Sequence, residues 1–103
     1  MAIFYLLYSA SPKPSHPEVE EIGGVFVNFW ISAKTLAEAK ATSLAALDAN
    51  DWTPDEPEEA REVSEAYYAD NPEGLSAYRQ ALRDGIVMIE YVFPPEEEGE
   101  PEN

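Results

Sequence analysis

The side chains of this protein that could do chemistry are one histidine and a dense group of carboxylates. Residues 48–73 read DANDWTPDEPEEAREVSEAYYADNPE and hold ten acidic side chains against a single arginine. Such a group could bind a metal ion, supply carboxylates for acid–base catalysis, or attract a cationic partner. The chain contains no cysteine, so thiolate metal sites and cysteine nucleophiles are excluded. Function must therefore be sought first in the acidic segment.

A calcium site is the first alternative, and the residue spacing argues against it. When Asp48 is placed at position 1 of an EF-hand loop, Glu59 falls at position 12, as the motif requires. Position 6 is then Thr53, where the loop needs a glycine for its sharp turn, and Trp52 takes the place of a ligand. Pro54 further disturbs that turn. We therefore expect no metal ion and no other cofactor.

The sequence also gives little indication of catalysis. His16, the only histidine, lies in PSHPE between prolines, and such a loop positions a general base poorly. No nucleophile-elbow motif accompanies it. Ten acids in one segment make some close carboxylate pair inevitable, so a pair of this kind does not indicate a glycosidase. We expect a protein that is not an enzyme.

The net charge narrows the class of partner. The 103 residues include 21 acids and 6 bases, a net charge of −15. This charge repels phosphate backbones and anionic lipids, so we expect no direct binding to nucleic acid or to a membrane. It favours basic protein partners, since long-range attraction accelerates association by about 10 to 1000-fold at low salt. Fifteen of the acids lie in residues 48–73 and 96–102, and this clustering favours a use beyond a solubilising surface, which is the alternative.

The opening residues, MAIFYLLYSAS, superficially resemble the apolar region of a secretory signal. No Lys or Arg precedes the apolar run, and the run is too short to span a bilayer. We interpret it as a β-strand. Together with the absence of cysteine, this predicts a cytoplasmic protein.

Hydrophobic patterning predicts three strands and two helices around the acidic segment. Apolar runs bounded by proline and glycine indicate strands at residues 3–10, 25–32 and 86–93. Capping signals at Thr35 and Asn71 indicate helices over residues 35–49 and 71–84. Three large residues at helical spacing form the expected buried stripe of the second helix: Leu75, Tyr78 and Leu82.

Residues 57–68 allow two interpretations. Pro57 could begin a helix that ends at Tyr68, or residues 60–63 could form a short edge strand followed by a helical turn from Ser64. We favour the edge strand, because a sheet of only three strands would leave an apolar edge open.

These elements predict an α+β fold in a single domain, residues 1–95. We expect a single-layer antiparallel or mixed sheet of three to four strands with two helices packed on one face. The arrangement is loosely ferredoxin-like, although the first helix follows the second strand and so departs from the βαββαβ order. Residues 96–103, EEEGEPEN, are expected to be a disordered acidic tail.

The resulting functional hypothesis is a non-catalytic acidic protein that inhibits or neutralises a basic partner. An immunity protein against a nuclease toxin and a DNA-mimic inhibitor of a nucleic-acid-binding protein both fit this description. The residues expected to bind the partner are Asp55, Glu56, Glu58, Glu59, Glu62, Glu65 and the half-exposed Trp30. The alternative is an α+β domain that forms a homodimer, or serves as an accessory subunit, through an aromatic sheet face.

Overall fold

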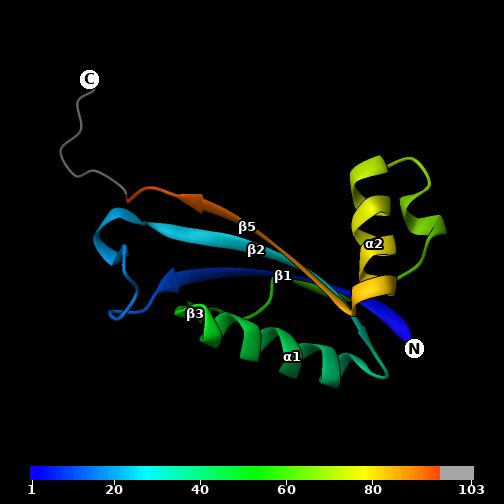
Figure 1. The fold of residues 1–103 in the computed structure, drawn as a ribbon, viewed down its shortest axis with the longest axis horizontal. Coiled ribbons are helices and arrows are strands. Elements are labelled where there is room, and N and C mark those ends of the chain that lie inside the picture. The colour runs from blue at the N-terminus through cyan, green and yellow to red at the C-terminus, as the bar shows by residue number, and fades with distance from the viewer. Residues whose placement is uncertain (96–103) are drawn as a thin grey trace.

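One antiparallel sheet organises the chain, and the computed structural model describes residues 1–95 of it. The two central strands, β1 (Ala2–Pro12) and β2 (Gly24–Ala33), pair over most of their length. The last strand, β5 (Ile86–Phe93), pairs with the other edge of β2 (Figure 1). Their runs of branched and aromatic residues suit extended strands with apolar side chains on both faces.

The other edge of β1 carries two short strands in succession. β3 (Trp52–Pro54) pairs with the end of β1, and β4 (Glu59–Val63) pairs with its first half. The sheet order is therefore β3-β1-β2-β5, with β4 also on β1. A short 3-10 helix, η2 (Ala66–Tyr68), follows β4, and another, η1 (Val19–Glu21), lies between β1 and β2.

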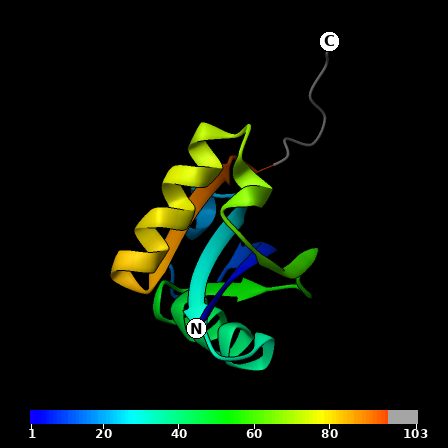
Figure 2. The same ribbon diagram turned by 90° about the vertical axis from the view of Figure 1, so that its right-hand side faces the viewer.

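The two α-helices lie on opposite faces of the sheet (Figures 1 and 2). The helix α1 (Leu36–Ala49) begins at Thr35, whose hydroxyl oxygen accepts a hydrogen bond from the Glu38 amide at 3.1 Å. The helix α2 (Pro72–Asp84) begins at Asn71, whose side-chain oxygen accepts from the Gly74 amide at 3.0 Å. Both capping signals predicted from the sequence are therefore confirmed.

Each face of the sheet has its own core. The α1 face is fully buried along the middle of β1 and β2, with Leu6, Tyr8, Val27 and Phe29 at 1% exposure or less. The α2 face buries a second, smaller cluster in which Trp30 and Tyr68 pack with Ala77 and Ala81 of the helix. Successive residues of a strand point to opposite faces, so one apolar run supplies both cores.

The predicted α+β class, the three long strands and the two helices are confirmed. The preferred interpretation of residues 57–68 is also confirmed, because an edge strand and a 3-10 turn stand there rather than a helix. The sheet has five strands rather than three to four, since the three-residue β3 is too short to give a sequence pattern. The element order, ββαββαβ, differs from βαββαβ. The tail expected to be disordered, residues 96–103, lies outside the described residues.

Two further predictions need correction. The helices were expected on one face, but both faces of β1 and β2 are apolar and each requires a cover. The fully buried residues of α2 are Gly74, Ala77 and Ala81. Of the predicted stripe, Leu75 and Tyr78 are half-buried and pack against the same cluster, whereas Leu82 is 56% exposed. The bulky rings of Trp30 and Tyr68 occupy the space between α2 and the sheet, so small residues face them.

None of the helices within residues 1–95 combines the length and the apolar character that crossing a bilayer demands.

Candidate functional site

The acidic segment forms one free edge of the sheet. Between β3 and β4 the chain takes two more residues than β1 does over the same span, since Ala10 pairs with Pro54 and Leu7 with Glu59. This bulge remains bonded to β1: the Asp55 amide donates to the Ser9 carbonyl at 2.9 Å, and the Glu58 amide donates to the Leu7 carbonyl at 2.7 Å. The carboxylates of this segment are therefore held on a hydrogen-bonded scaffold.

We call the six predicted acids on this segment the acidic edge: Asp55, Glu56, Glu58, Glu59, Glu62 and Glu65. Asp55 and Glu56 are exposed beside α1, where they line a shallow hollow with Lys40. Glu59 pairs with Leu7 and Glu62 pairs with Phe4, and paired residues point to the same face of a sheet. Glu59 therefore lies on the α2 side and Glu62 on the α1 side. Glu65 is exposed after β4, next to η2. The structure therefore places all six along one edge, with side chains directed to both sides of it.

Two of these acids form ion pairs. Glu59 pairs with Arg61 on the same strand, and Glu65 pairs with Arg79 of α2 at 2.7 Å. Among the ion pairs of residues 1–95, none involves the other four acids of the acidic edge. Their negative charge is compensated by no direct partner there.

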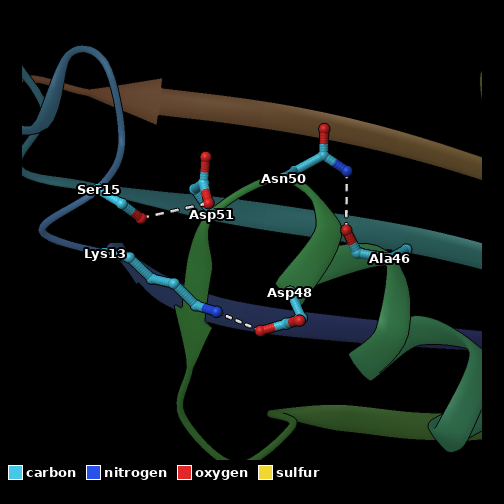
Figure 3. Close-up of polar contacts among 6 residues, drawn as sticks. All are labelled: Lys13, Ser15, Ala46, Asp48, Asn50 and Asp51. Carbon is cyan, nitrogen blue, oxygen red and sulfur yellow. Dashed lines mark hydrogen bonds and ion pairs between the residues drawn. The ribbon is translucent and has the colours of Figure 1, made fainter.

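The first two acidic residues of the segment, Asp48 and Asp51, make contacts that stabilise the fold. Asp48 at the end of α1 pairs with Lys13, and Asp51 accepts a long hydrogen bond of 3.4 Å from the Ser15 hydroxyl (Figure 3). Asn50 closes the helix by donating from its side chain to the Ala46 carbonyl at 2.7 Å. These contacts tie the loop after β1 to the start of β3, which fixes where the acidic edge begins.

Trp30, the seventh predicted binding residue, does not lie half-exposed. It is 8% exposed, because η2 and α2 cover it, and its indole N–H donates to the Tyr68 hydroxyl at 2.7 Å. It instead forms part of the wall of a pocket.

This aromatic pocket lies on the α2 face of the sheet and has a volume of 380 Å³. Its walls carry five aromatic rings: Tyr5, Trp30, Tyr67, Tyr68 and Tyr91. Its polar lining includes Asn28 from β2, Glu59 and Arg61 from β4, and Glu73 from the first turn of α2. A volume of this size is within the range of about 300 to 1,000 Å³ that small-ligand sites have.

Hydrogen bonds and ring contacts order the floor of the pocket. The Tyr5 hydroxyl donates to the Asn28 side-chain oxygen, and its ring lies 5.1 Å from that of Trp30. Burial, with a smaller contribution from the Glu59 carboxylate, raises the pKa of Tyr5 to about 12. Tyr5 therefore stays a neutral hydrogen-bond donor at ordinary pH.

Beyond the pocket, the α2 face of the sheet is open. The helix covers only one end of this face, near Trp30 and Val87. At the other end Phe26 and Phe93 are 40% and 38% exposed, and Tyr91, which also lines the pocket, is 59% exposed. We call this region, with its three large side chains, the open sheet face.

His16 makes local structural contacts in the loop after β1. Its Nδ1 accepts a hydrogen bond from the Glu18 amide at 3.0 Å, and its ring lies 4.9 Å from that of Trp52. Within residues 1–95, no group of three or more His, Asp or Glu side chains is placed to hold a metal ion.

The acidic edge was visible in the sequence, but the aromatic pocket was not. Its walls come from β1, β2, β4, η2, α2 and β5. Strand pairing brings β1, β2, β4 and β5 together, and the packing of Trp30 with Tyr68 and α2 adds the other two elements. The one sequence signal was the presence of aromatic residues on each of the three long strands, among them Tyr5, Trp30 and Tyr91.

Comparison with known proteins gives no relative from which a function could be transferred: no family model matches the chain, nor does any curated protein or solved structure at a significant level.

Proposed function

We propose that this protein is a non-catalytic binding protein whose acidic edge docks on a basic protein and inhibits or neutralises it. The partner class is a nucleic-acid-binding protein or a toxin, as for an immunity protein or a DNA mimic. The observation that carries the proposal is the bulge between β3 and β4, where backbone amides of Asp55 and Glu58 donate hydrogen bonds to β1 and fix the main chain that carries exposed carboxylates. A main chain that is already ordered loses little backbone freedom on binding.

Electrostatics supports the same role. Four carboxylates of the acidic edge have no ion-pair partner within residues 1–95, and the whole chain carries a charge of −15. Such a field attracts cationic surfaces over about 10 Å at 0.1 M salt and raises association rates. It repels nucleic acid and anionic membranes. Since the chain has no cysteine, a reducing compartment suits it, and we place the protein in the cytoplasm.

Capture with matched variants tests the proposal. The edge variant carries Asp55→Asn, Glu56→Gln, Glu58→Gln and Glu62→Gln. The control variant carries Glu18→Gln, Glu20→Gln, Glu21→Gln and Asp84→Asn, which neutralises equally many exposed acids at η1 and at the end of α2. Wild type and control variant should capture the same basic protein from native lysate and release it with salt, and the edge variant should not. Equal capture by all three would contradict the proposal.

A second candidate function is favoured by the open sheet face. Phe26, Tyr91 and Phe93 expose a contiguous part of one sheet face that a second copy or a larger subunit could cover. In this alternative the acids serve only solubility. Light scattering after size-exclusion chromatography separates the two: a dimer that persists at every salt concentration supports the alternative, and a monomer contradicts a homodimer.

A further inference from the structure

One cation of the chain itself lines the aromatic pocket. The guanidinium carbon of Arg61 lies 5.9 Å from the centroid of the Tyr5 ring and 5.4 Å from that of Tyr67. Both distances are within the roughly 6 Å over which a cation is attracted to an aromatic face. Arg61 also pairs with Glu59. The rings and this carboxylate together make a place that fits a guanidinium group.

Arg61 occupies this place loosely. Its side chain is 47% exposed and that of Glu59 is 39% exposed. Ion pairs with this much solvent access contribute little to stability, since water and salt screen them. Replacing Arg61 by an equivalent cation from outside would therefore cost the protein little.

The charge of the pocket selects the ligand class. Two carboxylates line it, Glu59 and Glu73, and Arg61 is the single cation among its described lining residues. The chain around it has a net charge of −15, which repels anions and a second copy of the same chain alike. A cationic group with a flat, stackable surface fits both the rings and the charge, and arginine offers this better than lysine does.

We propose that the aromatic pocket receives one arginine side chain of a basic partner protein, whose guanidinium takes the place of that of Arg61 against Tyr5, Tyr67 and Glu59. This inference rests on the proposed function and gives it a specific anchor. Glu59 belongs to both the acidic edge and the pocket, so a partner lying along the edge can reach the pocket. An arginine inserted in an aromatic pocket is a frequent centre of binding energy in protein interfaces.

The experiment uses N-acetyl-arginine methylamide as probe and its neutral citrulline analogue as control. Binding to the full chain is followed by the NMR shift of the Trp30 indole N–H, which bonds to Tyr68 in the pocket wall. The Trp52 indole N–H is an internal control, because it bonds to Glu90 at 2.9 Å and packs in the α1-face core. The arginine probe should shift Trp30 and leave Trp52 in place, and the citrulline probe should shift neither. Equal shifts from both probes, or no shift of Trp30, would overturn the inference.

Exposed substitutions sharpen the test without endangering the fold. Arg61→Gln vacates the rings and frees Glu59, so the arginine probe should bind about threefold more tightly, the effect of an exposed charge pair. Glu59→Gln and Tyr67→Leu should weaken it. Weaker binding to Arg61→Gln would contradict the inference.

The two proposals can fail separately. The edge variant leaves every lining residue of the pocket unchanged, so it should bind the arginine probe. A basic partner captured through the acidic edge, combined with no probe binding in the pocket, would reject the inference and leave the proposed function standing.

Discussion

At the scale of single residues, the core of the α1 face depends on one satisfied polar group. Ser43 is fully buried in α1, and its hydroxyl donates to the Lys40 carbonyl at 2.7 Å. A hydroxyl has one proton, so the Tyr8 hydroxyl is the donor in the 2.7 Å bond between Tyr8 and Ser43. Ser43 thus ties the centre of β1 to the helix that covers it.

This arrangement predicts unequal effects for two substitutions. Ser43→Ala leaves the Tyr8 hydroxyl buried without a partner, which should lower the free energy of unfolding by about 1 to 3 kcal/mol. Tyr8→Phe leaves Ser43 bonded to Lys40 and should cost only about 0.5 to 1.5 kcal/mol. The double variant should lose less than the sum of the two. Urea unfolding measures all three, and a larger loss for Tyr8→Phe than for Ser43→Ala would contradict the assignment of donor and acceptor.

Tyr5 predicts a loss of stability at alkaline pH. Its phenol ionises near pH 10.0 in the unfolded chain and near 12 in the folded one, mainly because burial raises its pKa. Below pH 10 both states are protonated; between about 10 and 12 only the unfolded state loses its proton, so stability falls as pH rises through this window. Burial raises the pKa values of Tyr8 and Tyr68 in the same direction.

Chemical unfolding at about pH 9 and about pH 11 measures this loss. Tyr5→Phe should lose less stability between the two than wild type does, with the remaining loss due to the other buried tyrosines. An unchanged loss in Tyr5→Phe would show that Tyr5 is not the group responsible.

At the scale of elements, the caps and the long strands could be predicted from local patterns, but the packing of α2 could not. The caps Thr35 and Asn71 act within one turn, so the sequence alone reveals them. The buried face of α2 depends on Trp30 and Tyr68, which come from other elements, so Ala77 and Ala81 are its most buried residues while Leu75 and Tyr78 lie at the margin and Leu82 is exposed. The aromatic pocket escaped prediction for the same reason, whereas the acidic edge lies within one short segment and was found.

At Gly74 the helix α2 lies directly against the Tyr68 ring of η2. A Cβ atom there would lie 2.3 Å from Cδ1 and 2.6 Å from Cε1 of the Tyr68 ring. Gly74→Ala should therefore displace the Tyr68 ring and break the hydrogen bond between the Trp30 indole and the Tyr68 hydroxyl. Overpacking of this kind should lower the free energy of unfolding by about 1 to 3 kcal/mol. Ser76→Ala, at an exposed position of the same helix, is the matched control and should be close to neutral. If both variants unfold at the same urea concentration and the NMR signal of the Trp30 indole N–H is unchanged, the close approach of Gly74 to Tyr68 is not required for stability.

At the scale of the whole molecule, the two helices cover the two faces of the sheet to different extents. The α1 face is buried along β1 and β2, although Val92 of β5 is 52% exposed on it. The α2 face leaves the aromatic pocket accessible next to Glu59 of the acidic edge, and the open sheet face accessible on β2 and β5. The molecule extends 47 × 29 × 20 Å. At 0.01 M salt the Debye length is about 30 Å, so charges interact across its two shorter dimensions and over much of its length. A basic protein would first be attracted by the long-range electrostatic field and would then form short-range contacts with the surface.

The rate at which the captured partner associates with wild type, edge variant and control variant, measured over a series of salt concentrations, tests the central claim most directly. The account predicts fast, strongly salt-dependent association for wild type, a nearly unchanged rate for the control variant, and a rate for the edge variant that is slower by about tenfold or more at low salt with a flatter salt dependence. Equal rates and equal salt slopes for the edge and control variants would contradict it, because the position of the carboxylates would then not matter.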